Sequence, residues 1–214
     1  MIHYATISFA TYMAKLLHTI NPDLVLNKKA EMMMDKLIKI IIRTLIGNNK
    51  SITHKDISFA ATTLFVGEIK MRALSSIAAA IIQFTCSIQD IDVKKHNRRS
   101  TSGLVISVSK IEALMGAYSA CETKDKMASI AMTALVEYIC YEILDISSVS
   151  YQKKTISSTR IKTSVSNDNE LAHFFKNTIP RHITFKSIYL SVIRKIRVSK
   201  SCRTTPSITM CVHA

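Results

Sequence analysis

The sequence predicts an all-α protein made of two tandem units that share one order of helices. Only four glycines and three prolines occur in 214 residues, and a chain with few helix breakers favours long helices over turn-rich β structure. Hydrophobic residues recur at mostly helical spacing through both halves. The order short helix, long helix, short helix and extra helix occurs twice, on either side of a polar segment at residues 87–102.

The first unit begins with a helix over residues 4–20. This helix ends at Asn21, because a residue before a proline is pushed out of the α region. Asn27 is placed to cap a long helix that stops at Gly47. The long helix is apolar over more than half its circumference, which predicts that it is buried.

Two further helices complete the first unit. Thr53 caps a short helix over residues 54–65, and Asp56 three positions later completes a pattern like a capping box. Gly67 interrupts the helical pattern, and residues 68–85 form the extra helix.

The second unit repeats this order with different residues. Ser107 caps a short helix that runs to about Gly116. After a polar stretch, a long helix follows and extends to about Tyr151. Short helices are expected near residues 158–166 and 168–175, the last with an acidic start as the helix dipole prefers.

The long helix of the second unit is predicted to be amphipathic, with acids gathered on one side. At about 100° per residue, one side is an apolar stripe of Met132, Val136, Ile139, Ile143 and Ile146. The other side carries Glu137, Glu142 and Asp145. Such a cluster is either a solvated helix face or a docking surface for basic partners, and the helix alone leaves both interpretations open.

The charge balance predicts a polyanionic partner. Lys and Arg total 29 against 15 Asp and Glu, a formal net charge of +14, which suits nucleic acid or an anionic membrane surface. No uninterrupted apolar run reaches the roughly 18 residues of a membrane span, so we expect no membrane insertion, and the first residues lack a signal-peptide pattern.

Catalysis and metal binding receive no support from the sequence. The five cysteines contain no Cys-x-x-Cys pair, which fits free thiols in a reducing compartment better than a zinc site or a disulfide framework. The seven histidines are dispersed, and no Gly-rich phosphate loop is present. We therefore predict no catalytic residues, no metal site, no cofactor and no enzyme activity.

Short runs in the two units resemble two different histones. In the first unit the matching runs resemble histone 2B, and they include Lys15-Leu16-Leu17, Pro22-Asp23, Ser51-Ile52-Thr53 and Gly67-Glu68. In the second unit they resemble histone 2A, and they include Ala134-Leu135-Val136-Glu137-Tyr138, Lys153-Lys154-Thr155 and Asn167-Asp168. The resemblance covers about residues 8–195. A fused pair in this order is similar to the viral histone doublets of the marseillevirus-like giant DNA viruses.

The resemblance implies two tandem histone folds packed as an intramolecular handshake pair. Residues 1–86 would form the histone 2B-like fold, 87–102 a linker and basic arm, and 103–176 the histone 2A-like fold. Residues 177–193 would be a docking segment and 194–214 a basic C-terminal tail.

The resemblance also implies a path for DNA phosphates along loops between the helices. Helix starts and lysines neutralise phosphates without reading bases, so binding should be sequence-tolerant and salt-dependent. The residues expected to contact DNA are Lys28, Lys29, Lys50, Ser51, Arg98, Arg99, Lys110, Lys153, Lys154, Thr155 and Arg160. Loop arginines of the family are replaced here by Thr123 and Ile156, which suggests weaker or shorter DNA wrapping.

Two docking surfaces follow from the same resemblance. The acidic patch that binds basic tails would comprise Glu68, Glu137, Glu142, Asp145, Asp168 and Glu170. Ser76 and Asn169 stand where the family has acids, so this patch is thinned. The segment docking on a histone 3–histone 4 partner would use Ile179, Phe185, Ile188 and Tyr189.

These expectations describe a structural protein that packages double-stranded DNA without sequence specificity. Its implied partners are a histone 3–histone 4-like protein and a second copy of itself in a nucleosome-like particle. Its implied locations are the virion and the viral factory, or the host nucleus or cytoplasm. One alternative is a histone-fold transcription or architectural factor that forms no such particles. Another is a basic helical protein for membranes or RNA, which would need a helix with a lysine-rich polar face.

Overall fold

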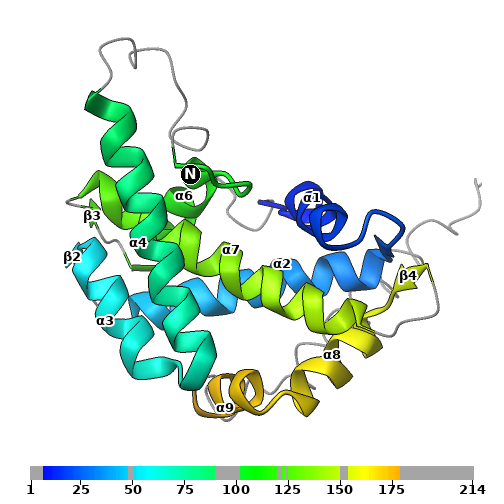
Figure 1. Cartoon of the computed structure of the whole chain (residues 1–214). Coiled ribbons are helices and arrows are strands. Elements are labelled where there is room, and N and C mark those ends of the chain that lie inside the picture. Colours follow the sequence, from blue (N-terminus) through cyan, green and yellow to red (C-terminus); the bar gives the residue numbers. More distant parts are fainter. Residues whose placement is uncertain are drawn as a thin grey trace, which may run out of the picture.

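The computed structural model describes residues 7–47, 51–89, 102–119, 122–123, 125–149 and 154–178 (Figure 1). In this part of the chain the fold is helical, as predicted. The helices are α1 (Ala10–Ile20), α2 (Lys28–Ile46), α3 (His54–Leu64), α4 (Gly67–Gln89), α6 (Val108–Ser119), α7 (Lys126–Ser148), α8 (Ser158–Asn167) and α9 (Asn169–Thr178). The strands are β1 (Val25–Leu26), β2 (Ser51–Ile52), β3 (Glu122–Thr123) and β4 (Thr155–Ile156).

Capping side chains fix the helix starts that the sequence predicted. The Asn27 side chain accepts a hydrogen bond from the Ala30 N–H at 2.8 Å. Thr53 and Asp56 form a complete capping box at the start of α3. Ser157 caps α8 in the same way, through the Arg160 N–H at 3.2 Å. These bonds satisfy backbone donors that a helix start leaves without intrahelical partners.

The two units share one hydrophobic core around α2 and α7. Figure 1 shows these two long helices crossing the middle of the molecule. Helices α1 and α3 of the first unit pack on α7 of the second, whereas α6 and α8 of the second unit pack on α2 of the first. One continuous cluster of buried residues includes side chains from both units. Each long helix is therefore covered by short helices of the other unit.

The N-terminal half of α7 differs from the predicted single apolar stripe. Every residue of 128–136 is fully buried, including the polar Ser129 and Thr133. The Thr133 hydroxyl donates to the Ser129 carbonyl at 2.6 Å, and the Ser129 hydroxyl donates to Lys126. These bonds let polar side chains occupy a buried helix. Only the C-terminal half, where Tyr141 is 40% exposed, is amphipathic.

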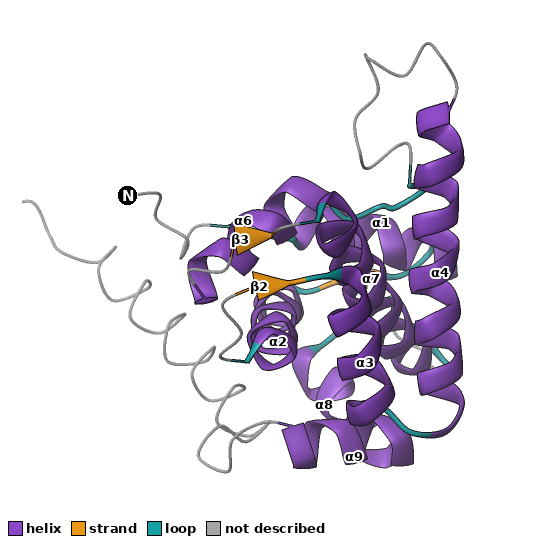
Figure 2. Cartoon of the chain, turned by 90° about the vertical axis from the view of Figure 1, so that its left-hand side faces the viewer, coloured by secondary structure: helices purple, strands orange, loops and turns teal. Residues whose placement is uncertain are grey.

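In the described part of the chain, four two-residue strands form two parallel pairs that the sequence did not predict. Strand β1 pairs with β4, with Val25 opposite Thr155 and Leu26 opposite Ile156. Strand β2 pairs with β3, and Figure 2 shows these two strands side by side. Each pair joins a loop of the first unit to a loop of the second.

Among the described residues, two helices are long and apolar enough to cross a membrane, which the sequence analysis did not expect. They are the segments Gly67–Ser87 in α4 and Lys126–Ser148 in α7. The apolar window of α7 is 72% buried inside the protein, as in the core helix of a soluble fold, whereas that of α4 is 28% buried. Length and composition of one or two helices are weak evidence for a membrane span.

Candidate functional site

The first strand pair brings two helix starts together. The Val25 N–H donates to the Lys154 carbonyl at 2.9 Å, and the Asn27 N–H donates to the Ile156 carbonyl at 3.1 Å. Helix α2 begins directly after Asn27, and α8 begins directly after Ser157. Two helix N-termini, each with a positive dipole end, therefore lie at this end of the molecule.

Four of the predicted DNA-binding residues surround these helix starts. Lys28, Lys29, Lys154 and Thr155 are all exposed. The Lys28 ammonium lies 3.0 Å from the Glu31 carboxylate, but its side chain is 77% exposed. An exposed pair of this kind is weak, so it leaves Lys28 able to meet an anion.

The second strand pair repeats this arrangement with α3 and α7. Thr53 caps α3 and Asp125 caps α7, where the Asp125 carboxylate accepts the Met127 N–H at 2.8 Å. His54 Nδ1 lies 2.6 Å from Asp125 Oδ2, so a side-chain hydrogen bond joins the two units at this end. Burial alone would raise the pKa of Asp125, but hydrogen bonds from His54 and Met127 outweigh it and lower that pKa.

Two lysines beside this second pair were not predicted. Lys55 and Lys126 are exposed in the first turns of α3 and α7. The sequence signal that could have found them is a lysine within two positions of a capping residue. Of the predicted residues at this end, Ser51 lies in β2.

Two other predicted DNA-binding residues make contacts within the protein. The Arg160 guanidinium donates to the Ser147 carbonyl at 3.2 Å and to the Val149 carbonyl at 2.7 Å, at the C-terminus of α7. The Lys110 ammonium donates to the Ser8 carbonyl at 3.0 Å and lies 5.0 Å from the centre of the Tyr12 ring. Both side chains therefore connect elements of the fold.

Several predicted residues lie outside the described part of the chain. These are Lys50, Arg98, Arg99 and Lys153 of the DNA path, and Ile179, Phe185, Ile188 and Tyr189 of the docking segment. The predicted linker at residues 87–102 begins too early, because residues 87–89 continue α4. Its residues 90–101 and the tail from residue 194 onward lie outside the described part as well.

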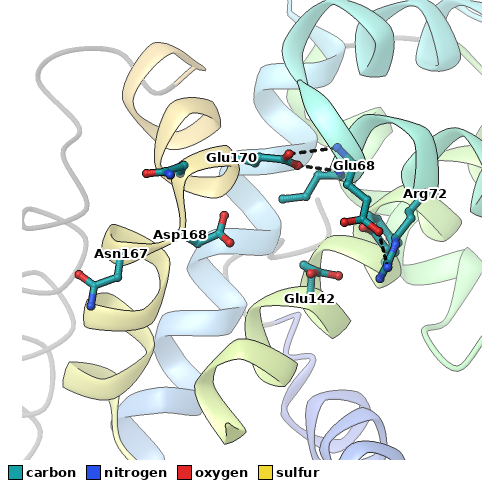
Figure 3. A pocket seen from close by; sticks show the side chains of 9 residues that line it. Glu68, Arg72, Glu142, Asn167, Asp168 and Glu170 are labelled. Carbon is teal, nitrogen blue, oxygen red and sulfur yellow. Dashed lines mark hydrogen bonds and ion pairs between the residues drawn. The ribbon is translucent and has the colours of Figure 1, made fainter.

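Four of the six predicted acidic-patch residues line one pocket. Its volume is about 360 Å³, and Figure 3 shows Glu68, Glu142, Asp168 and Glu170 around it. Glu68 comes from α4, Glu142 from α7, Asp168 from the turn after α8, and Glu170 from α9. The pocket is therefore formed by both units together.

Two of these carboxylates also hold helix starts. The Glu170 oxygens accept the Glu68 N–H at 3.0 Å and the Ile69 N–H at 2.8 Å, which caps α4 from the other unit. Asp168 accepts the Leu171 N–H at 2.8 Å at the start of α9. Backbone donors thus compensate part of the negative charge of the pocket.

An arginine of the protein itself stands at this pocket. Figure 3 shows Arg72 joined to Glu68 by a hydrogen bond, and this bond raises the pKa of Arg72. Burial raises the pKa of Glu142, and the nearby Asp145 adds to that effect, whereas the Tyr138 hydroxyl and Arg72 oppose it. The pocket is therefore less negative than its four acids suggest.

The remaining two acids of the predicted patch lie elsewhere. The Glu137 carboxylate accepts the N–H groups of Val105 and Ile106, at 2.8 and 2.7 Å, and so holds the segment that enters α6. Asp145 does not line the pocket. Of the three acids that the sequence placed on one side of the long helix, only Glu142 therefore lines the pocket, and Glu137 and Asp145 do not.

Within the described residues, no group of three or more His, Cys, Asp or Glu side chains could hold a metal ion. Comparison with known proteins assigns no family: no protein-family model matches this chain, and no curated protein matches it.

Proposed function

We propose that this chain is a structural DNA-packaging protein, a fused histone 2B–histone 2A doublet whose two folds pack as an intramolecular handshake pair. It binds duplex DNA without sequence specificity and assembles with a histone 3–histone 4-like partner into nucleosome-like particles. The observation that carries the proposal is the presence of two parallel strand pairs, each joining loops of both units beside two helix N-termini and exposed lysines.

These features suit phosphate groups better than bases. Helix N-termini present backbone N–H groups and the positive end of the helix dipole. Lysines add point charges that release counterions from DNA. Neither kind of group distinguishes one base pair from another, so the interface favours binding to any sequence.

The spacing of the two strand pairs suits one turn of a duplex. Strand β1 precedes α2 and β2 follows it, and Figure 1 places β2 and β4 at opposite ends of the long helices. At a rise of about 1.5 Å per residue, a helix of this length spans roughly 28 Å, close to the roughly 34 Å of one DNA turn. Both ends can therefore meet successive phosphate stretches on one face of the duplex.

A salt titration of DNA binding tests this interface. We would compare the double variant Lys29→Glu with Lys154→Glu against the double variant Lys70→Glu with Lys176→Glu, which changes the charge equally but lies on α4 and α9. Each lost phosphate contact should flatten the plot of log affinity against log salt by about 0.9. Only the first double variant should show a flatter slope, and equal slopes for the two variants would exclude the strand-pair interface.

Reconstitution separates packaging from the alternative of an architectural factor. The chain would be mixed with a histone 3–histone 4 partner and DNA, and the products digested with a nuclease. A packaging protein should leave a DNA fragment of defined length. Binding of DNA without a protected fragment would instead support the architectural factor.

A further inference from the structure

The outward face of α2 is basic from its first turn to its last. At about 100° per residue, five cations of this helix fall within one sector of about 100°. They are Lys28, Lys29, Lys36, Lys39 and Arg43. Lys28, Lys29 and Arg43 are exposed, and the other two are half-buried. The opposite side of the helix is buried in the core.

The two acids of α2 lie outside this sector and make contacts within the protein. At about 100° per residue, Asp35 is about 20° and Glu31 about 60° beyond its edge. The Asp35 carboxylate accepts the Phe9 N–H at 2.7 Å and so holds the start of α1. Glu31 lies 3.0 Å from the Lys28 ammonium. The sector itself therefore contains cations and no anion.

Helix stability does not explain these charges. Lys28 and Lys29 stand at the positive end of the helix dipole, where acids are preferred. Lys39 and Arg43 are four residues apart, and like charges at this spacing repel each other. A helix face that is merely solvated usually carries both signs of charge. The arrangement therefore suits an external anion.

The basic face lies between the two strand pairs. Figure 1 shows α2 running from the end of the molecule that carries β4 to the end that carries β2. Figure 2 looks nearly along α2 and shows α6 above it, α8 below it and α7 beside it. These helices pack on α2, as α1 does, and they leave the cationic sector facing outward. Lys28 and Lys29 belong both to this sector and to the first strand-pair site.

We propose that the outward face of α2 binds the phosphate backbone of duplex DNA between the two strand pairs. This contact rests on the proposed function, because the same duplex would meet the strand pairs and the helix. Lys29, Lys36 and Arg43 follow one another at steps of seven residues, so the row is about 21 Å long. One DNA strand carries a phosphate about every 3.4 Å, or roughly six over that length.

The middle of the face favours DNA over a protein partner. Of the four residues nearest the middle of the sector, three are Lys36, Lys39 and Arg43, and the fourth is the half-buried Met32. The residues three and four positions from Met32 are all charged, so no apolar row is available to an opposing helix. The centre of a protein–protein interface is depleted of charged residues, and of lysine in particular.

Two other occupants fit the face less well than DNA does. A helix that lies on a membrane inserts its apolar side, but the apolar side of α2 is buried within the protein. Residues 179–214 of the same chain contain basic residues and no Asp or Glu, so they are repelled by a basic face.

A salt titration of DNA binding by the full chain tests the proposal. Each lost phosphate contact flattens the plot of log affinity against log salt by about 0.9, so Lys39→Gln with Arg43→Gln should flatten it by about 1–2. The matched control is Lys70→Gln with Lys176→Gln, which removes the same charge from α4 and α9 and should keep the parent slope. Equal slopes for these two double variants would overturn the proposal.

A charge-conserving variant separates lost charge from damaged structure. Lys39→Arg with Arg43→Lys keeps both cations and should keep the parent slope, whereas an equal flattening would show that charge is not the cause and would overturn the proposal. Circular dichroism of each variant checks that its helices are intact.

A third double variant distinguishes failure of this contact from failure of the proposed function. Lys126→Gln with Lys154→Gln removes one exposed lysine beside each strand pair and none from α2. If only this variant flattens the slope, the strand-pair interface stands and the contact of α2 is refuted. If only Lys39→Gln with Arg43→Gln flattens it, the contact of α2 stands without the strand pairs. A parent chain that binds no DNA refutes both.

Lysine labelling tests which anion covers the face. The reaction of Lys39 with an amine-selective reagent should slow when a DNA duplex is bound, whereas Lys70, which is also half-buried, should react as before. Protection of Lys39 by polyglutamate and not by DNA would identify an acidic protein partner. If Lys39→Gln with Arg43→Gln loses flotation with phosphatidylserine vesicles but keeps the parent salt slope, the face binds lipid. Either of these two results overturns the proposal.

Discussion

At the scale of single residues, Gly67 and Glu170 connect the two units at the start of α4. Gly67 has a φ of +57°, and a Cβ at this position would lie 1.9 Å from Glu170 Oε1. A side chain would therefore be strained by the backbone and would also displace the carboxylate that caps α4.

We expect Gly67→Ala to reduce the free energy of unfolding by about 2–3 kcal/mol, from backbone strain and the lost charge-assisted cap. Urea denaturation monitored by circular dichroism measures this change. In a chain that already carries Glu170→Ala, Gly67→Ala should reduce the free energy of unfolding only through backbone strain, by about 1 kcal/mol. Additive effects of the two substitutions would show that Gly67 is not required to admit the carboxylate.

The hydrogen bond between His54 and Asp125 gives the second prediction. The pKa of Asp125 is lowered in the folded chain from its ordinary value of 3.8. Its stabilisation is therefore complete above that value and is lost as the pH falls through the lower, folded pKa. We expect Asp125→Asn to cost about 1 kcal/mol at pH 7, because an asparagine still caps the helix but lacks the charge.

A pH series of unfolding experiments checks this expectation. The difference between Asp125→Asn and the parent chain should shrink as the pH is lowered below 3.8. Asp23→Asn, at an exposed position before β1, is the control and should change stability by less than about 0.5 kcal/mol at any pH. A cost for Asp125→Asn that stays constant down to pH 3 would contradict the linkage.

Residue-level predictions from the sequence were strongest where a local rule fixes the partner. Asn27, Thr53 and Asp56 cap helices as expected, because their partners lie three residues away. Glu137 and Arg160 could not be placed in the same way. Their partners, the Val105 N–H and the Ser147 carbonyl, are 32 and 13 residues away, and periodicity carries no information about such contacts.

At the scale of elements, helix order was predictable and strand pairing was not. Hydrophobic period, capping residues and glycines placed most of the described helices within a few residues of their observed bounds. The prediction was wrong for the start of the first helix, which was expected at residue 4 and begins at Ala10, because the Phe9 N–H bonds the Asp35 side chain of α2 and residues 7–9 are not helical. The four strands have two residues each, too few for an alternating pattern. They exist because the fold brings two loops together, so the pairing is a property of the packed pair of units.

The N-terminal half of α7 shows a second limit of periodicity. Ala128, Ala131 and Ala134 are fully buried, yet small residues at several angular positions weaken the signal of an amphipathic helix. They mark a helix surrounded on all sides by close neighbours. An exposed helix face would tolerate larger side chains at such positions.

We expect Ala131→Leu to reduce the free energy of unfolding by about 1–3 kcal/mol, because the added atoms have no space in a packed core. Tyr141→Leu, in the exposed face of the same helix, should change stability by less than about 1 kcal/mol. Thermal denaturation of the two variants measures both effects. A stable Ala131→Leu variant would mean that the surroundings of α7 contain unfilled space.

At the scale of the whole molecule, the shared core makes the two units mutually dependent. Helix α7 packs against α1, α3 and α4 of the first unit, and α2 packs against α6 and α8 of the second. Separation would expose the buried side chains of both long helices to water. The sequence suggested this arrangement, because two short helices cannot cover an apolar long helix.

The last prediction concerns the two units expressed as separate fragments, residues 1–89 and 102–214. Each fragment alone should lack a cooperative unfolding transition, because more than one side of its long helix would be solvated. Mixed in equal amounts, the fragments should recover the transition, at a midpoint that rises with concentration. The intact chain cleaved within residues 90–101 is the control and should unfold cooperatively. A cooperative transition in either isolated fragment would show that one unit has a sufficient core of its own, and would remove the main physical reason for the fusion of two units in one chain.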